Sequence, residues 1–275
     1  MTHPTIAFIG GGNMASSLIG GLLENGHPAS AILATARSEQ TRSALNEKFG
    51  IACMADNSEA AKRADVVVLA VKPQMMRDVC SSLTDALDHQ PLIVSVAAGI
   101  TTDLIGNWLG GDHAIVRCMP NTPSQLHCGA SGLFANSAVS AEQRKLAETL
   151  LSAVGIVEWV VNEDLMDAVT AIAGSGPAYY FLIMELMEKV GIELGLNPDT
   201  ARQLTIQTAL GAAKMAAQGD IEPAELRARV TSKKGTTDRA ITTFLKEGLE
   251  DIMRKGITGA RDRGRELAIE MSNQS

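Results

Sequence analysis

Two patterns of hydrophobic and polar positions divide the chain of 275 residues. The first part alternates short apolar runs, typical of buried strands, with amphipathic stretches that are typical of helices. The runs predict strands over residues 6–9, 32–35, 66–71, 92–96, 114–119, 128–135 and 155–161. The stretches between them predict helices over residues 13–24, 39–49, 59–63, 102–109 and 140–153. This alternation predicts an α/β fold with a doubly wound, mainly parallel sheet.

No convincing strand pattern follows Asn162. The remaining stretches predict helices over residues 165–173, 178–194, 199–218, 238–245 and 249–271, with a further short helix opened by Glu222-Pro223. We expect Gly174 to stop the first of these helices and Pro177 to stand in the first turn of the next. The predicted organisation is an α/β domain over residues 1–162 and an all-α domain over residues 163–275.

The helices of the second domain carry apolar residues on more than one face, as in Phe181-Leu182-Ile183-Met184. A helical domain of this size has little interior in which to bury them. They must either cover one another or meet a second copy of the chain. We predict a homodimer formed through the helical half.

Composition narrows the classes of partner. The net charge is −7 and no basic run exceeds two residues, which argues against nucleic acid. No apolar stretch approaches the roughly 20 residues that span a bilayer, and the N-terminus lacks the pattern of a signal peptide. The four cysteines form no C-x-x-C pair, which favours free thiols in the cytoplasm. The five histidines have no ligand spacing, so we expect no metal site.

The first strand leads into a glycine-rich turn. Gly10, Gly12 and Ala15 match the pattern G-x-G-x-x-G/A. Gly10 allows a tight turn, Gly12 lets a pyrophosphate approach the backbone, and Ala15 lets the next helix pack close to the strand. The helix that begins near Asn13 offers free N–H groups to the phosphates. A turn without a ligand is the alternative, but a strand before the motif and a helix after it favour a dinucleotide site.

The end of the second strand indicates which dinucleotide binds. Folds specific for NAD usually place an acid there to hold the ribose 2′-hydroxyl. This chain has Thr35, Arg37 and Ser38 instead, which suit a 2′-phosphate. An exposed arginine at a strand end is common by itself. The missing acid and the arginine together favour NADP, with NADPH preferred and NADH as the alternative.

Other strand ends lie at the same edge of the predicted sheet, where ligands bind in such folds. Lys72 could face a phosphate or the nicotinamide, or stand in solvent. The small residues from Ala97 to Gly99 would let a flat ring lie against the backbone. Asn121 sits in a stiff loop between Pro120 and Pro123, which suits ligand positioning better than a plain turn.

A second anion site is expected at Gly235-Thr236-Thr237, before a predicted helix. Free N–H groups there could hold the carboxylate of a small substrate, although an ordinary threonine cap is the commoner arrangement. Spacing alone does not decide between the two. The segment Gly174-Ser175-Gly176-Pro177 is either a helix break or a surface for the substrate.

Proton donors are scarce in the second half. No lysine lies between Lys145 and Lys189, and no histidine follows His127. Enzymes that reduce a carbonyl usually need such a donor, which leaves Lys233 and Lys234 as candidates. A protonated imine arrives with its positive charge, so a hydroxyl that holds the ring nitrogen would suffice.

Several segments together resemble the pyrroline-5-carboxylate reductase family over essentially the whole chain. They are residues 8–15 (Phe-Ile-Gly-Gly-Gly-Asn-Met-Ala), 70–74 (Ala-Val-Lys-Pro-Gln), 119–123 (Met-Pro-Asn-Thr-Pro), 174–179 (Gly-Ser-Gly-Pro-Ala-Tyr) and 230–232 (Val-Thr-Ser). One departure is Lys233-Lys234, where the family usually has Pro-Gly or a close variant. It could reshape the substrate loop, raise its positive charge or leave activity unchanged.

The resemblance implies a Rossmann-type domain and a helical domain that dimerises, with further assembly into rings such as a decamer. It implies hydride transfer from NAD(P)H to the C=N carbon of pyrroline-5-carboxylate, which gives proline in the last step of its synthesis. Thr237 would hydrogen-bond the ring nitrogen, while backbone N–H groups of residues 235–237 would hold the carboxylate. Substrate contacts are expected from Ser175, Ser232, Gly235, Thr236, Thr237 and Asn121. Cofactor contacts are expected from Gly10, Gly12, Asn13, Met14, Thr35, Arg37, Ser38, Asn57, Ala70, Val71, Lys72, Ala97 and Gly99.

Two other functions compete with this interpretation. One is a related two-domain dehydrogenase of a 3-hydroxy acid. The absence of a lysine between Lys145 and Lys189 argues against it. The other is a non-catalytic cofactor-binding protein, such as a redox sensor, which only Lys233-Lys234 encourages. A panel of substrates separates the first, and NADPH binding without imine reduction identifies the second.

Overall fold

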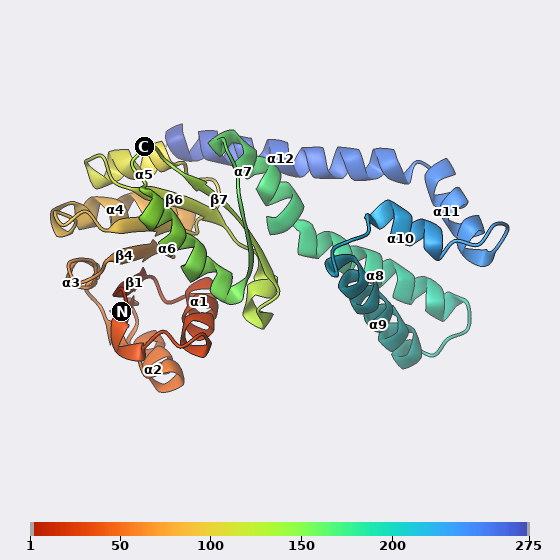
Figure 1. Ribbon diagram of the computed structural model, residues 1–275, viewed down its shortest axis with the longest axis horizontal. Helices are drawn as coiled ribbons and strands as arrows, with labels where there is room; N and C mark the ends of the chain where they lie inside the picture. The colour runs from red at the N-terminus through yellow and green to blue at the C-terminus, as the bar shows by residue number, and fades with distance from the viewer. Residues whose placement is uncertain (1–2, 274–275) are drawn as a thin grey trace. The chain divides into compact units, whose positions relative to one another are not determined.

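Eight strands form one sheet in the computed structural model, which describes residues 3–273 (Figure 1). Their spatial order is β3-β2-β1-β4-β5-β6-β7-β8. The strands are β1 (Ile6–Ile9), β2 (Ile32–Thr35), β3 (Ala52–Met54), β4 (Val66–Leu69), β5 (Leu92–Ser95), β6 (Ile115–Met119), β7 (Gly129–Ala135) and β8 (Gly155–Trp159). The order changes direction at β1, which pairs in parallel with β2 on one side and β4 on the other. Such a switch point is where doubly wound sheets bind their ligands.

The predicted strands are present, and the sheet is mainly parallel as expected. One exception is β7, which runs antiparallel to β6. The link over residues 120–128 is too short for the crossover that parallel neighbours need. The three-residue edge strand β3 was not predicted, because its short sequence has no clear alternation. The predicted strand over 66–71 ends two residues early, at Leu69.

Helices cover both faces of the sheet (Figure 1). On one side lie α1 (Asn13–Glu24), α2 (Glu39–Phe49) and α6 (Ala141–Leu151); on the other lie α3 (Asn57–Ala61), α4 (Met76–Leu83) and α5 (Thr102–Leu109). Ile6 and Phe8 belong to the first core, and Ala7 and Ile9 to the second. Successive residues of a strand face opposite sides, so a strand buried on both faces needs a continuous apolar run.

Helix α4 was missing from the expected elements. Its buried residues, Met76, Val79, Cys80 and Leu83, follow the spacing i, i+3, i+4, i+7 of an amphipathic helix. The signal was therefore in the sequence, although polar residues between these positions interrupt it.

The helical segment ends at Gly174, as predicted, but its last turn is π-helical. Helix α7 (Met166–Val169) continues into a π-helical turn over Thr170–Gly174, and α8 (Gly176–Glu193) begins two residues later. The Ser175 N–H donates to the Thr170 carbonyl at 2.8 Å, five residues back. A Cβ on Gly174 would collide with the Met119 side chain. Gly174 therefore also leaves room for the Met119 side chain. A glycine that ends a helix and a glycine that is needed for close packing look the same in the sequence.

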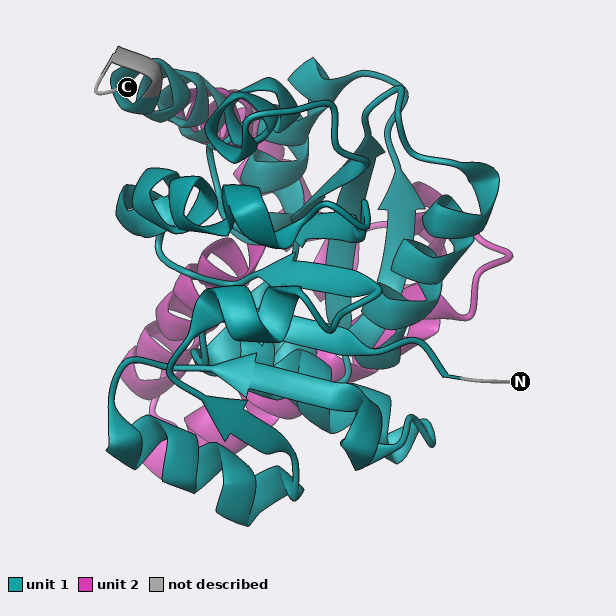
Figure 2. Ribbon diagram, turned by 90° about the vertical axis from the view of Figure 1, so that its left-hand side faces the viewer, with its two compact units in different colours: residues 1–175, 260–275 teal, residues 176–259 magenta. Residues whose placement is uncertain are grey.

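The chain divides into two compact units (Figure 2). Unit 1 comprises residues 1–175 and 260–275, and unit 2 comprises residues 176–259. Helix α12 (Leu249–Asn273) is shared between them. The domain boundary predicted after residue 162 stays a prediction, because the units are defined by internal contacts alone.

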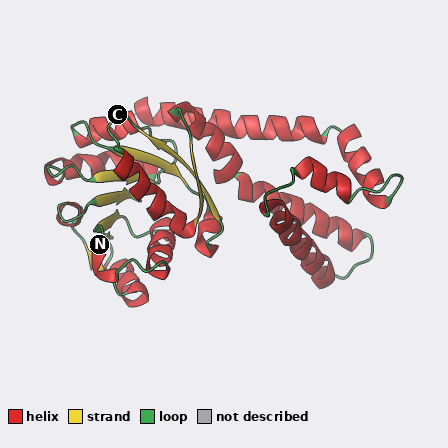
Figure 3. Ribbon diagram, in the orientation of Figure 1, coloured by secondary structure: helices red, strands yellow, loops and turns green. Residues whose placement is uncertain are grey.

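Unit 2 is built from helices (Figure 3). They are α8, α9 (Pro198–Ala217), α10 (Pro223–Arg229), α11 (Thr236–Lys246) and the first part of α12. Within residues 176–259, all of which the structure describes, only Gly176, Ala201 and Thr205 are buried. The unit therefore has almost no interior of its own. No helix within residues 3–273 combines the length and apolar character needed to cross a membrane.

Candidate dinucleotide and substrate sites

The turn after β1 has the geometry that its motif requires. Gly10 has a φ of +108°, and a Cβ there would lie 2.6 Å from the carbonyl oxygen of Ala70. The Gly10 N–H donates to Thr35 Oγ1 at 3.2 Å. Apart from Gly12 and its two chain neighbours, no heavy atom of the described residues lies within 4 Å of the position that a Cβ on Gly12 would take. This open backbone at the start of the 12-residue helix α1 fits the pyrophosphate of a dinucleotide.

The first residues of α1 divide between solvent and core. Asn13 is exposed, and its carbonyl accepts a hydrogen bond from Ser17 Oγ at 2.9 Å. Met14 is half-buried and packs against the core, while Ala15 is fully buried. The small side chain of Ala15 thus allows the close helix–strand packing that the motif predicts.

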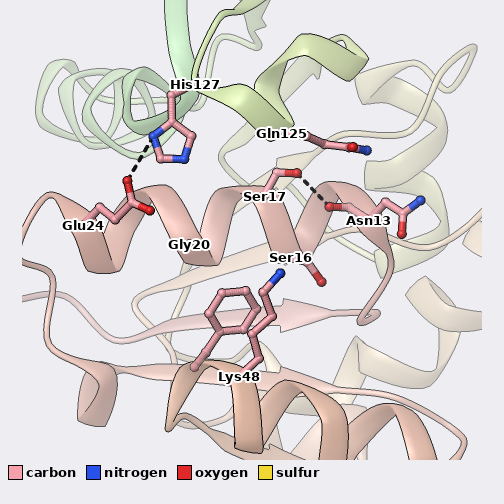
Figure 4. A pocket seen from close by; sticks show the side chains of 9 residues that line it. Asn13, Ser16, Ser17, Gly20, Glu24, Lys48, Gln125 and His127 are labelled. Carbon is pink, nitrogen blue, oxygen red and sulfur yellow. Dashed lines mark hydrogen bonds and ion pairs between the residues drawn. The ribbon is translucent and has the colours of Figure 1, made fainter.

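A hollow of about 400 Å³ follows one side of α1 (Figure 4). At one end His127 Nδ1 lies 3.2 Å from Glu24 Oε2. Its lining residues are Asn13, Ser16, Ser17, Gly20, Glu24, Lys48, Phe49, Gln125 and His127. Among the residues predicted to bind cofactor or substrate, only Asn13 borders it. The hollow is therefore a different surface from the one that the glycine motif marks.

Thr35, at the end of β2, supports the glycine turn. It is 1% exposed, and its hydroxyl accepts from the Gly10 N–H and donates to the Phe8 carbonyl at 3.4 Å. Both hydrogen-bonding capacities of the hydroxyl are thus used inside the protein. Sequence reasoning identified the position and missed the orientation, because the partners come from another strand.

Arg37 and Ser38 follow Thr35 on the surface. Ser38 caps α2, since its Oγ accepts the Thr41 N–H at 3.1 Å. Arg37 is exposed, with Nη2 lying 3.3 Å from Met75 Sδ. Of the three side chains predicted to meet a 2′-phosphate, Arg37 alone makes no hydrogen bond to an oxygen atom of residues 3–273.

The ends of β4 and β5 hold further predicted cofactor residues. Lys72 is exposed, whereas Ala70 and Val71 lie under the Gly10 turn. Ala97 is buried, at 5% exposure. Asn57 is half-buried at the start of α3.

Gly99 lies beside the last part of α12, inside unit 1. A Cβ on Gly99 would be 3.9 Å from Met271 Sδ. Met271 also packs against the core that α4 and α5 share. The C-terminal helix thus borders the turn after β5, a neighbour that no local pattern predicted.

Asn121 has its amide group in use. Its Nδ2 donates to the Ala173 carbonyl at 3.1 Å, and its Oδ1 accepts the Ala130 N–H at 3.0 Å. The side chain therefore ties the loop after β6 to β7 and to the π-helical turn. Ser175, directly after that turn, is half-buried.

The second predicted site is the start of α11, in unit 2. Gly235 is the N-cap of the helix, and its N–H donates to the Ser232 carbonyl at 2.9 Å. Thr236 is exposed and Thr237 is half-buried. Within the described residues, the N–H groups of Thr236 and Thr237 have no hydrogen-bond partner. These donors and the positive end of the helix dipole suit a carboxylate.

The Lys233-Lys234 segment has an unusual backbone conformation. Lys234 has a φ of +62°, in the left-handed region that favours glycine. Its N–H donates to Asp238 Oδ2 at 2.9 Å, which holds the loop against the first turn of α11. The loop therefore keeps a conformation suited to the family's usual glycine and places two exposed lysines before the helix.

The predicted residues fall into two groups. The cofactor residues, Asn121 and Ser175 belong to unit 1, and Ser232, Gly235, Thr236 and Thr237 belong to unit 2. Sequence reasoning missed Arg42, which bonds two carbonyls of the segment after β2. It also missed Glu163, which bonds Thr102 and Arg117. Neither residue stands in a motif, so only their partners reveal them.

Other chemistries find little support. Burial raises the pKa of the Cys80 and Cys118 thiols to about 12, so both are protonated at neutral pH and are poor nucleophiles. Within residues 3–273 no cluster of three or more His, Cys, Asp or Glu side chains could hold a metal ion. The glycine turn at the switch point of the sheet defines a dinucleotide-binding protein of the Rossmann type, with a second, helical part.

Comparisons with known proteins specify the family. A model described as "Pyrroline-5-carboxylate reductase dimerisation" matches residues 163–267, and one described as "NADP oxidoreductase coenzyme F420-dependent" matches residues 5–99. The chain is 52% identical to a pyrroline-5-carboxylate reductase of Pseudomonas aeruginosa, over 98% of this chain and 99% of that one. It is 47% identical to one of Vibrio alginolyticus, over 97% and 98%.

A solved structure agrees with these relatives. The pyrroline-5-carboxylate reductase of Coxiella burnetii matches with a TM-score of 0.94 and 46% identity, over 97% of this chain and 99% of that one. The chain belongs to the pyrroline-5-carboxylate reductase family.

Proposed function

We propose that the chain reduces 1-pyrroline-5-carboxylate to L-proline, the final step of proline biosynthesis, with NADPH preferred over NADH. The proposal rests on one observation: in a chain of this family, two helices have N-terminal ends suited to bind an anion. One is the open Gly12 backbone before α1, and the other is the Gly235-Thr236-Thr237 start of α11. The first suits a pyrophosphate and the second suits the carboxylate of the substrate.

The cofactor roles follow from the surroundings of each residue. Gly10 shapes the turn, Gly12 admits the pyrophosphate, and Arg37 binds the 2′-phosphate. Thr35 acts from behind the turn, because its hydroxyl is already bonded to the Gly10 N–H. The adenosine and nicotinamide ends are assigned to Asn13, Met14, Ser38, Asn57, Ala70, Val71, Lys72, Ala97 and Gly99.

The substrate roles belong mainly to the start of α11. The free N–H groups of Thr236 and Thr237 hold the carboxylate, and the Thr237 hydroxyl orients the ring nitrogen. The Gly235 N–H, which was predicted to join them, is already used inside the turn. Ser232 shapes the turn, because its carbonyl accepts the Gly235 N–H. Asn121 and Ser175 complete the assigned substrate residues.

The reaction needs position more than acid strength. When bound, the nicotinamide supplies a hydride to the C=N carbon. The imine arrives protonated, so the electron pair of the C=N bond comes to rest on a nitrogen that already carries its proton. Thr237 therefore needs only to hold that nitrogen in line, with the reacting atoms about 3–3.5 Å apart.

Self-association is part of the same proposal. The dimerisation model covers unit 2, and we infer a homodimer that assembles further into a ring such as a decamer. Mass measurement of the native particle tests the size. The four cysteines are free thiols, which supports a cytoplasmic location.

Oxidation of NADPH, followed by absorbance with and without pyrroline-5-carboxylate and repeated with NADH, tests the activity. We expect rapid oxidation that requires the imine and is faster with NADPH. Tight NADPH binding without imine-dependent oxidation would overturn the proposal.

Thr237→Ala tests the substrate assignment. We expect kcat to fall about tenfold or more, the value of one hydrogen bond of roughly 1.5 kcal/mol, with NADPH binding nearly unchanged. Thr242→Ala is the control, because Thr242 is exposed on the same helix. Equal turnover in Thr237→Ala and wild type would refute the role.

A further inference from the structure

The segment after β2 needs more than Arg37 to bind a phosphate. It carries the carbonyl oxygens of Ala36 and Arg37, whose partial negative charge disfavours a nearby dianion. The Arg37 side chain is exposed, and within the described residues the Met75 sulfur is the one hydrogen-bond partner of its guanidinium. A flexible arginine on an unsupported segment would lose much of its binding energy to ordering.

Arg42 supplies that support. It lies one turn into α2, where its N–H donates to the Ser38 carbonyl at 3.2 Å. Its side chain reaches back to the segment, and Nη1 donates to the carbonyls of Ala36 at 2.7 Å and Arg37 at 2.8 Å. Both are short, charge-assisted bonds. One guanidinium nitrogen thus fixes two successive carbonyls and satisfies them.

The guanidinium of Arg42 has no ion-pair partner among the described residues. No carboxylate lies within 4.0 Å of the Arg42 guanidinium in the part of the chain that the structure describes. Its positive charge is therefore not neutralised by an ion pair. The nearest acid in sequence, Glu39, is exposed in the first turn of α2. Glu47 is also exposed and lines the same hollow as Glu39 and Arg42, and within the described residues neither acid forms an ion pair with the arginine.

We propose that Arg42 is a positioning residue for NADPH: it holds the Ala36–Arg37–Ser38 segment in the conformation in which Arg37 meets the 2′-phosphate. The inference rests on the NADPH preference of the proposed function. NADH lacks the 2′-phosphate. Arg42 therefore affects the preference for NADPH over NADH and contributes little to binding the parts that the two cofactors have in common.

The test compares Arg42→Gln with wild type in steady-state kinetics for NADPH and NADH. We expect KM for NADPH to rise about tenfold, KM for NADH to change by less than about twofold, and kcat with either cofactor to stay close to the wild-type value. Arg42→Lys keeps the charge and part of the hydrogen bonding, and should recover part of the loss. Lys48→Gln removes a charge at the other end of α2 and is the matched control.

Calorimetric binding of 2′,5′-ADP and 5′-AMP isolates the phosphate, since these ligands lack the nicotinamide. We expect Arg42→Gln to raise the Kd for 2′,5′-ADP about tenfold and to leave the Kd for 5′-AMP unchanged. The proposal would be overturned if Arg42→Gln lost affinity equally for both ligands, or if it lost affinity for neither.

Arg37→Gln separates this proposal from the proposed function. Loss of 2′-phosphate discrimination in Arg37→Gln but not in Arg42→Gln leaves the NADPH preference intact and refutes the role of Arg42. Equal binding of both ligands by wild type refutes the NADPH preference and the role of Arg42 together.

Discussion

At the scale of single residues, the two glycines of the dinucleotide motif have different roles. Gly10 is needed by the fold, because its φ is +108° and the Ala70 carbonyl is close by. Gly12 is not needed by the fold, since its backbone has a φ of −81° and open space at the Cβ position. The two glycines can therefore be separated experimentally.

Gly10→Ala should lower the free energy of unfolding by about 1–3 kcal/mol, because the new Cβ meets backbone in a strained conformation. Gly12→Ala should leave the melting temperature nearly unchanged and weaken NADPH binding at least tenfold, because the Cβ fills the space that the pyrophosphate needs. Thermal melts and calorimetry measure the two quantities. A strongly destabilised Gly12→Ala, or a stable Gly10→Ala, would contradict this division.

Polar residues at the predicted sites show a limit of residue-level reasoning. Thr35 and Asn121 stand at strand ends where ligands bind, yet both use their side chains to hold neighbouring backbone. Such a residue can position a site without touching what binds there. Their sequence neighbourhoods do not distinguish the two roles.

At the scale of elements, an ion pair between buried Arg117 and half-buried Glu163 joins three segments of unit 1. Glu163, before α7, lies 3.1 Å from Arg117 of β6 and accepts two hydrogen bonds from Thr102 of α5, both at 2.8 Å. The Arg117 side chain is 6% exposed. This pair fixes the point at which the chain leaves the sheet for the helical part.

Glu163→Ala should lower the free energy of unfolding by about 3–5 kcal/mol, because it leaves the Arg117 charge buried without its partner. Glu225→Ala is the matched control. It breaks an exposed pair with Arg229, in which both side chains are 57% exposed, and should cost less than about 1 kcal/mol. Urea unfolding measures the free energy of unfolding of both variants. If the two variants lost similar amounts of it, burial would not determine the strength of the Arg117 pair.

At the scale of the whole molecule, the missing interior of unit 2 is the dominant fact. Phe181, Leu186 and Val190 on α8 are between 49% and 63% exposed in a single copy. The family model that covers these helices is a dimerisation model. We infer that self-association covers these apolar faces, which would account for an amphipathic pattern too broad for one helical layer.

Phe181→Glu should shift the protein to smaller species in sedimentation velocity, because it places a charge in this apolar surface. Asn107→Glu adds the same charge at an exposed site on α5 of unit 1 and should leave the sedimentation coefficient unchanged. Phe181→Glu protein that sediments like wild type would show that α8 lies outside the interface.

Local patterns were enough to predict much of this protein. The strand, the glycine turn and the helix from Ile6 to Glu24 were predicted within the right bounds, because each depends on neighbours a few residues away. The parallel sheet, the strandless second half and the family followed from the order of such patterns. The roles assigned to Arg37 and Thr237 stay predictions.

Only the tertiary structure decided how distant residues meet. The edge strand β3 pairs with β2, from which helix α2 separates it in the sequence. The direction of β7 depends on the path of a loop, and the close packing at Gly174 depends on Met119. Thr35, Asn121 and Arg42 acquire their roles from partners that no motif names. The physical reason is that backbone conformation is governed by local sterics and hydrophobic period, whereas hydrogen-bond partners and close approaches are chosen among groups that only the packed chain brings together.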